Sequence, residues 1–168
     1  MKPFLRKYVL YGLILGVMTA VFLRIFVFEF LRVEGVSMEP AFMDGSTVCV
    51  NKLAYGLDIP FGDSQLFSWS SPKVGDVVVF MMEGNMVVKR CAAISGMPLD
   101  YSFDSGYNLY AGGKSYSLTA LQYHLMAGNI QVPEGTILAI GDNEAKSIDS
   151  RDYGFVPEKN ILGRIICR

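Results

Sequence analysis

The sequence predicts a mainly β domain preceded by a single membrane-spanning helix. Three observations lead to this prediction. The N-terminal 30 residues are largely apolar with basic residues in front, the rest of the chain consists of short β-like runs broken by Gly, Pro, Asp and Asn, and two of these runs flank a turn typical of a hairpin. A chain of 168 residues is long enough for one domain with a small subdomain.

The N-terminal segment is long enough to cross a bilayer. Residues 8–23 carry no charge, and apolar character resumes after Arg24 as far as residue 28. A spanning helix needs about 20 such residues, and Arg24 and Arg32 can extend toward the headgroups. A cleaved signal peptide would need a small-x-small site, which residues 26–32 lack, and a buried core helix would not need a basic flank. We therefore expect an uncleaved signal anchor.

The charges around this segment predict its orientation. Lys2, Arg6 and Lys7 place the N-terminus in the cytoplasm by the positive-inside rule. Residues 1–30 are then the cytoplasmic N-terminus and the transmembrane anchor, and residues 31–168 form an extracytoplasmic domain. The expected location is a single pass through the cell membrane (inner or plasma membrane), with the lipid bilayer as a partner.

The composition after the anchor argues against two classes of function. From Val33 onward the net charge is −5, which disfavours a nucleic-acid partner because phosphate binding needs a basic face. The three cysteines, Cys49, Cys91 and Cys167, lack metal-ligand spacing, so no metal and no cofactor is expected. Each lies in an apolar run typical of buried thiols, and a disulfide between two of them is left open. His124 is interpreted as a structural or surface residue.

The first part of the domain predicts a strand and an irregular connection. Residues 47–53 have the composition of a strand. Residues 55–73 form a long loop or irregular hairpin that carries Phe61, Phe67 and Trp69. Beside a membrane anchor, these aromatic residues either enter the bilayer interface or pack on their own domain.

The clearest hairpin lies in the middle of the chain. Residues 75–82 and 86–94 are β-rich and flank a short turn with Gly and Asn. In the second strand Val87, Lys89, Cys91 and Ala93 share one face. Lys89 is then either an edge-strand charge or a buried amine whose pKa is depressed.

The remaining segments alternate between weak and strong signals. Residues 98–117 predict one or two weak strands with tight turns, and residues 118–126 predict a short helix. Residues 130–140 form another β-like run, and residues 161–167 predict a closing strand.

Residues 141–154 are too charged and broken for a core strand. If residues 147–151 are extended, Ser147, Asp149 and Arg151 point to one side. That alternation suits a carboxylate–guanidinium pair that holds a hydroxyl in place. A solvated polar loop is the other interpretation of this segment.

A serine lies on a constrained connection directly after the anchor. Ser37 follows a glycine at position 35 and precedes a proline at position 40. Glycine allows backbone geometry closed to other residues, and proline restricts the residue before it to extended conformations. Ser37 therefore lies on a turn rather than inside a helix, and it becomes a catalytic candidate if the chain also supplies a base.

In this order, the anchor, the constrained serine, the lysine and the polar loop resemble type I signal peptidases, which are membrane-anchored Ser-Lys proteases. The resemblance rests on the anchor and on four motifs in order: Gly35-Val36-Ser37-Met38-Glu39-Pro40; Gly75-Asp76-Val77-Val78-Val79-Phe80; Val88-Lys89-Arg90; and Gly141-Asp142-Asn143 with Ser147, Asp149, Ser150, Arg151 and Gly154. It implies a mostly antiparallel β fold of signal-peptidase type with residues 93–128 as a small noncatalytic β insertion.

The resemblance also implies roles for six residues. Ser37 is expected to be the nucleophile, Lys89 the general base, and Ser147 the hydroxyl that orients Lys89. Asp149 and Arg151 are expected to form a supporting ion pair, with Asp142 nearby. The expected substrates are precursor proteins that carry signal peptides.

The chemistry of these residues agrees with the resemblance. A serine hydroxyl is a weak nucleophile until an adjacent base takes its proton, and a lysine with a pKa of about 10.4 is almost entirely charged at pH 7. Burial can lower such a pKa by about 3–5 units. Val33 and Val88 are branched and adjoin the catalytic segments, so we expect them to form shallow substrate pockets that favour small side chains.

Four departures from the family pattern keep other functions open. The usual threonine after the motif's proline is Ala41, the usual aromatic two residues before the lysine is Val87, and Gly35 offers no side-chain oxyanion donor. The family's Gly-x-Pro-Gly-Asp is Gly-Met-Pro-Leu-Asp at residues 96–100. The alternatives are a specialised relative that processes one pilin or conjugative-transfer precursor, an inactive membrane-anchored binding domain, and a soluble self-cleaving Ser-Lys repressor, which the anchor and the acidic domain oppose.

Overall fold

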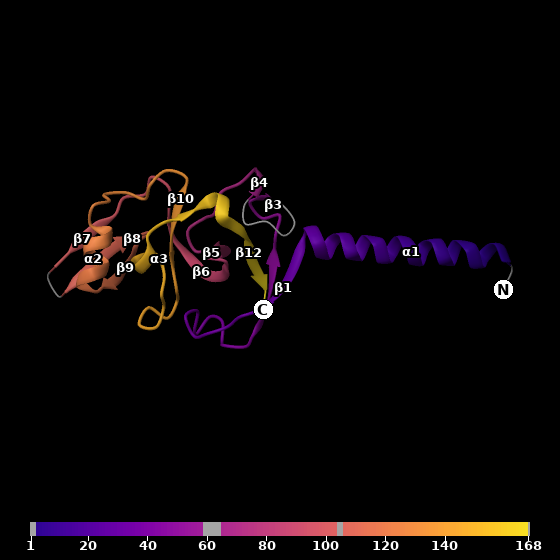
Figure 1. Cartoon of the computed structure of the whole chain (residues 1–168), viewed down its shortest axis with the longest axis horizontal. Coiled ribbons are helices and arrows are strands. Elements are labelled where there is room, and N and C mark those ends of the chain that lie inside the picture. Colours follow the sequence, from indigo (N-terminus) through magenta and orange to yellow (C-terminus); the bar gives the residue numbers. More distant parts are fainter. Residues whose placement is uncertain (1–2, 59–64, 104–105, 168) are drawn as a thin grey trace.

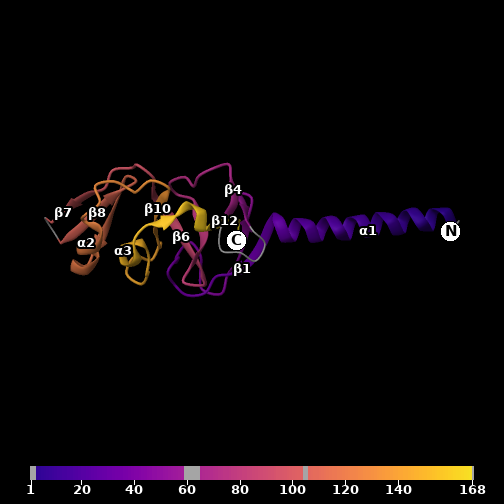
Figure 2. The same cartoon turned by 45° about the horizontal axis from the view of Figure 1, so that its top comes forward.

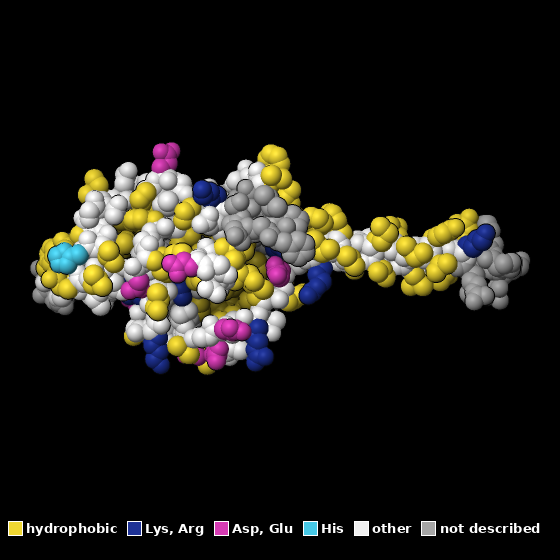
Figure 3. Space-filling model, in the orientation of Figure 1, with side chains coloured by type: hydrophobic (Ala, Val, Ile, Leu, Met, Phe, Trp, Pro, Cys, Tyr) yellow, Lys and Arg dark blue, Asp and Glu magenta, His cyan; other side chains and the backbone are white. Residues whose placement is uncertain are grey.

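A long helix stands apart from the β domain. The computed structural model describes residues 3–58, 65–103 and 106–167. Helix α1 (Pro3–Phe26) extends from the domain as a rod in both views (Figures 1 and 2). Its residues Lys7–Phe26 have a mean hydropathy of 2.2 and none of them is buried, and hydrophobic side chains follow its length (Figure 3). This helix has the length and composition that a bilayer span requires.

The anchor joins the sheet almost directly. Strand β1 (Phe28–Arg32) begins two residues after α1 ends and pairs with β2 (Thr47–Asn51). The Lys52 amine donates to the Ile25 carbonyl at 3.0 Å, which ties the helix end to the residue directly after β2. The domain boundary predicted after residue 30 therefore falls inside β1, because the backbone of this segment pairs with β2 rather than continuing the helix.

The domain is built on one antiparallel sheet. Within the described residues its strand order is β1-β2-β12-β5-β6-β10-β11, and every neighbouring pair is antiparallel. The remaining strands of this sheet are β5 (Val77–Met82), β6 (Asn85–Ile94), β10 (Thr136–Ile140), β11 (Val156–Pro157) and β12 (Ile161–Cys167). A single 3-10 turn, η1 (Glu158–Asn160), leads into β12. The predicted mainly antiparallel β architecture is confirmed.

The predicted central hairpin is confirmed as β5 and β6. Met82 lies opposite Asn85, so Glu83 and Gly84 form a two-residue turn. Both have positive φ angles, 50° and 80°, which is the geometry of the turn that matches the twist of a hairpin. The three valines of β5 are buried, and their β-branched side chains are typical of a strand.

The prediction that Val87, Lys89, Cys91 and Ala93 share one face of β6 is wrong for Ala93. The register with β10 shifts where Ala93 lies opposite Leu138 and Cys91 lies opposite Ala139. This irregularity inserts Ala92 and breaks the strict alternation of faces. Cys91 therefore packs in one cluster of buried residues, whereas Ala93 packs in a second, separate cluster.

The small lobe consists of a three-stranded sheet and a helix. Its elements are β7 (Asp100–Ser102), β8 (Tyr107–Ala111), β9 (Lys114–Leu118) and α2 (Ala120–Met126). The predicted weak strands and short helix are thus present, and Thr119 and Gln122 form a capping box at the start of α2. The lobe begins after Ile94, which still belongs to β6, so the insertion is shorter at its start than residues 93–128.

The backbone of the small lobe lies against the main sheet at one glycine. A Cβ on Gly112, between β8 and β9, would collide with the Ala92 carbonyl oxygen. Gly112 also has a positive φ of 57°. Only glycine meets both conditions, and this contact holds the lobe at the far end of the domain from α1 (Figure 1).

The segment after β2 forms the expected irregular hairpin. Strands β3 (Gly56–Asp58) and β4 (Gln65–Ser68) pair with a register shift. Phe67 and Trp69 are 66% and 58% exposed, so they do not pack on their own domain; Phe61 lies outside the described residues. The β-like run at 130–140 is a strand only from Thr136, because Pro133 lacks the N–H that a paired strand needs.

Candidate active site

Ser37 lies on a loop that closes on itself between β1 and β2. The Val33 N–H donates to the Ser46 carbonyl at 2.8 Å, and the Gly35 N–H donates to the Asp44 carboxylate at 2.8 Å. Met38, next to the serine, is completely buried and anchors the loop in the domain. The prediction that Ser37 lies on a constrained connection is thereby confirmed.

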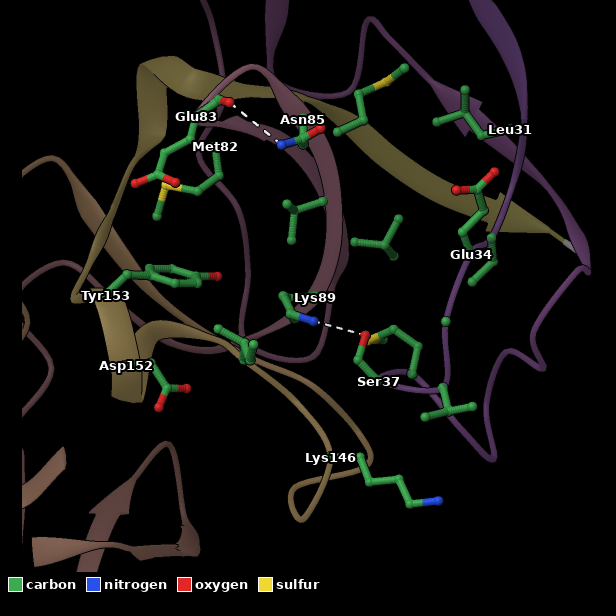
Figure 4. Close-up of a pocket in the computed structure, with 18 of the residues that line it drawn as sticks. Leu31, Glu34, Ser37, Met82, Glu83, Asn85, Lys89, Lys146, Asp152 and Tyr153 are labelled. Carbon is green, nitrogen blue, oxygen red and sulfur yellow. Dashed lines mark hydrogen bonds between the residues drawn. The ribbon is translucent and has the colours of Figure 1, made fainter. Parts of the chain in front are cut away.

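Lys89 reaches Ser37 from the middle of the main sheet. Its amine lies 2.8 Å from the Ser37 hydroxyl, and the side chain is 4% exposed (Figure 4). Of the two interpretations of Lys89, the buried amine is therefore correct, because the side chain is covered even though β10 pairs with β6 only from Arg90 onward. Burial lowers the pKa of Lys89 below its usual value of 10.5, and the carboxylates of Asp149 and Asp152 oppose this shift.

The predicted Asp149–Arg151 pair forms, but the backbone turns into a helix directly after Asp149. Arg151 Nε and Nη2 each lie 2.9 Å from an oxygen of Asp149, a two-point contact that is almost fully buried. Asp149 caps the short helix α3 (Ser150–Tyr153), where it accepts from the Arg151 N–H. The alternation expected for residues 147–151 is wrong, because a helix cap rather than a strand brings the two side chains together.

The charges of this pair are stabilised by further contacts. Arg151 donates to the carbonyl of Ser117 at 3.2 Å and to that of Glu144 at 2.9 Å. Burial raises the pKa of Asp149, but hydrogen bonds from Arg151 and from the Gly141 N–H outweigh this effect and hold that pKa below its usual range. Asp149 and Arg151 are thus buried and hold this segment in place. The alternative of a solvated loop is wrong for these two residues.

Ser147 lies beside the nucleophile's backbone. A Cβ on Gly141 would collide both with the Ser147 side chain and with the Ser37 carbonyl oxygen, so these two groups converge on the space that Gly141 leaves open. The Ser147 hydroxyl is buried and accepts no hydrogen bond within the described residues, but it lies close enough to the Asp149 carboxylate to help lower the pKa of Asp149. The expected contact from Ser147 to Lys89 is therefore not formed as a hydrogen bond in this structure.

Asp142 has a partner that the sequence did not suggest. Its carboxylate receives two hydrogen bonds from Arg90, at 2.7 and 2.6 Å, and Arg90 also donates to the Gly75 carbonyl. The following residue, Asn143, donates from its N–H to the Ser37 carbonyl at 3.0 Å. Asp142 thus joins the end of β10 to the residue next to Lys89, apart from the Asp149–Arg151 pair.

A groove of about 1010 Å³ contains the Ser37–Lys89 pair. Val33 and Val88, the predicted pocket residues, both line it. Sequence reasoning missed several other apolar residues of its wall, among them Met82, Met86, Ile148 and Tyr153. Ile148 carried a usable signal, since it is a lone aliphatic residue in a polar loop. His124 lies on α2 outside this groove, and its ring meets that of Tyr123 edge-on.

The groove includes an open strand edge. Residues Asn85–Arg90 of β6 pair with β5 on one side. On the other side β10 pairs with β6 only from Arg90 onward, within the part of the chain that the structure describes. The main-chain groups of residues 86–89 on that side are therefore available to another extended chain.

Comparisons with known proteins identify the family of this chain. The family model described as signal peptidase, peptidase S26, matches residues 5–168. Signal peptidase I V of Bacillus subtilis is 30% identical over 90% of this chain and 92% of its own length, and signal peptidase I of Bacillus caldolyticus is 32% identical over 85% and 80%. A solved signal peptidase I from Enterococcus faecalis is 26% identical, with a TM-score of 0.43, over 59% of this chain and all of that one. Because the family model covers nearly the whole chain, this chain belongs to the signal peptidase family, peptidase S26.

Proposed function

We propose that this membrane-anchored peptidase cleaves N-terminal signal peptides from exported precursors, with Ser37 as nucleophile and Lys89 as general base. The observation that carries the proposal is the buried Lys89 amine, 2.8 Å from the Ser37 hydroxyl in an open groove. A nucleophile and a base at this distance form the minimal unit of acyl-transfer catalysis. The relatives' names support the substrate class.

In the proposed reaction Lys89 acts first as a base and then as an acid. Neutral Lys89 takes the proton of the Ser37 hydroxyl as its oxygen attacks the scissile carbonyl, and the resulting ammonium then gives that proton to the leaving amine. The backbone N–H of Ser37 donates to the developing oxyanion. A water molecule, activated by Lys89 in the same way, then hydrolyses the acyl-enzyme.

The supporting residues hold the base and the nucleophile together. Asp149 and Arg151 fix the loop that carries Ser147, and Asp142 fixes β6 through Arg90. We propose that Ser147 accepts a hydrogen bond from the Lys89 ammonium once it has formed. Its buried oxygen accepts no hydrogen bond within the described structure, which leaves it available for this role.

The open edge of β6 suggests how a precursor binds. We propose that the segment before the cleavage site adds as a strand along residues 86–89, the mode called β-augmentation. Alternate side chains then face the enzyme, so that the residues at −1 and −3 meet the groove wall near Val33 and Val88 while −2 points away.

Membrane attachment would bring substrate and enzyme to the same surface. We propose the predicted topology, with the N-terminus in the cytoplasm and the catalytic domain outside. The exposed Leu66, Phe67 and Trp69 belong to the hairpin nearest the helix end and would contact the bilayer interface (Figure 1).

The substrate test is a series of precursors that vary at −1, −2 and −3. We expect cleavage of an Ala −1 precursor to slow with Val and to stop with Phe, because a methylene in a tight pocket changes binding by about 1–3 kcal/mol. Substitutions at −2 should have little effect. The measurement is kcat/KM for each precursor with the detergent-solubilised enzyme, with sequencing of the new N-termini.

Two results would contradict this prediction. Equal cleavage of Phe and Ala at −1 would show that the pocket is not shallow. Cleavage of one natural precursor whatever its −1 residue would favour the specialised pilin or conjugative-transfer peptidase, and no cleavage of any precursor would favour an inactive binding domain.

A second prediction concerns pH. Because only neutral Lys89 can act as the base, kcat/KM should rise with pH as Lys89 loses its proton, with a midpoint below 10.5. The negative charge of Asp152 raises the pKa of Lys89, so Asp152→Asn should move this rise to lower pH. Glu83→Gln removes another exposed groove carboxylate and serves as the control. A pH profile that is identical in Asp152→Asn and wild type would contradict the assignment of Lys89 as the titrating base.

A further inference from the structure

Two cysteines that the proposed reaction does not use lie opposite each other in the main sheet. Cys49 on β2 and Cys167 on β12 are paired in register. The register is irregular between Ile165 and Cys167, so that Cys167 rather than Ile166 lies opposite Cys49. Directly opposed residues on antiparallel strands have Cα atoms about 4.5–5.5 Å apart, which is within the range of about 4.4–6.8 Å that a disulfide spans.

The two thiols also differ in access. Cys49 is buried, whereas Cys167 is exposed, and both are free in this structure. Burial and then a hydrogen bond with the Cys167 thiol raise the pKa of Cys49, which agrees with side chains that face each other. Cys91, by contrast, is completely buried on β6, and its sulfur contacts the Ala93 carbonyl.

We propose that Cys49 and Cys167 are a disulfide site that links the last strand of the chain to the strand after the nucleophile loop. The bulge before Cys167 is the structural feature that creates the site, since a regular register would place an isoleucine opposite Cys49. The site contains no catalytic residue, so it does not depend on the proposed peptidase mechanism.

The bond would form by thiol–disulfide exchange with an oxidised disulfide compound, such as oxidised glutathione or a disulfide oxidoreductase. The exposed Cys167 thiolate attacks that disulfide and releases one thiolate of the oxidant. The Cys49 thiolate then attacks the Cys167 sulfur of the mixed disulfide and releases the second thiolate. The two cysteines lose two electrons and two protons in total, and the oxidant becomes two thiols.

The position of the site predicts its effect. Strand β12 lies between β2 and β5 in the sheet, and Cys167 is its last residue. A bond between positions 49 and 167 encloses most of the domain in one covalent loop, and long loops give the largest restriction of the unfolded chain. An extracytoplasmic domain, as the charge pattern predicts, is exposed to oxidising conditions in which such bonds persist.

The test uses the full-length chain in detergent, equilibrated with either oxidised or reduced glutathione. After the free thiols are alkylated, mass spectrometry of the unreduced digest should find one peptide pair that joins Cys49 to Cys167. The oxidised protein should melt higher than the reduced protein by about 5 °C or more. Cys49→Ser and Cys167→Ser should each abolish both the peptide pair and the shift, and the control Cys91→Ser should keep both.

Three results would overturn the proposal. The first is that glutathione remains attached to Cys167 with no bond to Cys49. The second is a bond that involves Cys91. The third is a melting shift that persists in Cys49→Ser, which would mean that oxidation acts elsewhere.

Discussion

Replacement of Ser37 or Lys89 by alanine is expected to lower precursor cleavage by on the order of 10³-fold or more, with the fold intact. The amine and the hydroxyl lie 2.8 Å apart, and each is the proposed partner of the other in the same proton transfer. Because such residues act as a unit, the double variant should be no slower than either single variant. The measurement is single-turnover cleavage of a labelled precursor, with circular dichroism and melting temperature as checks on the fold.

Lys146 provides a matched control for Lys89. It also lines the groove, but its side chain is exposed and points away from Ser37 (Figure 4). Lys146→Ala should therefore retain most of the activity. Residual turnover above a few per cent in purified Ser37→Ala would contradict the assignment of the nucleophile, and a Lys146→Ala variant as slow as Lys89→Ala would indicate a general charge effect.

Arg151→Ala is expected to have the largest effect on stability among the site residues. The guanidinium and the Asp149 carboxylate are 3% and 0% exposed, and the substitution leaves that carboxylate buried without its counter-charge. Removal of one partner of such a pair costs about 3–5 kcal/mol. In a domain of this size we expect the melting temperature to fall by roughly 6–20 °C.

Two further variants separate this mechanism from a general loss of packing. Arg164→Ala removes a guanidinium that is 42% exposed and lies 3.3 Å from Asp76, and an exposed pair of this kind contributes at most about 1 kcal/mol. Asp149→Asn combined with Arg151→Ala should recover part of the lost stability, because no buried charge then remains and asparagine still caps α3. If Arg151→Ala melts like the wild type, or if the double variant is less stable than Arg151→Ala, the buried-charge explanation is wrong.

The acid dependence of stability has a definite sign. The folded-state pKa of Asp149 lies below its ordinary value, so the carboxylate contributes stability above the unfolded pKa and loses it as pH falls through the folded pKa. The Asp149–Arg151 pair should therefore support the site throughout the neutral range in which we expect the enzyme to work.

Local patterns in the sequence were sufficient for most of the architecture. The charge-free run of residues 8–23 predicts the anchor, and the β-rich runs around Glu83 and Gly84 predict the central hairpin, because both signals depend on neighbouring residues alone. The six residues of the proposed site could be identified because their motifs occur in the family's order. The boundary of the anchor could not, since Phe28–Arg32 becomes a strand only through pairing with β2.

Only the tertiary structure decided whether Lys89 is buried and which partner each charged side chain contacts. On sequence evidence Lys89 was either an edge charge or a buried base, and only the folded structure shows that its side chain is buried against the Ser37 loop. The Arg90–Asp142 contact joins residues 52 positions apart, and the bulge on β12 sets Cys167 opposite Cys49. Burial, long-range pairing and register depend on how the strands meet in space, whereas periodicity and motif order are properties of the chain itself.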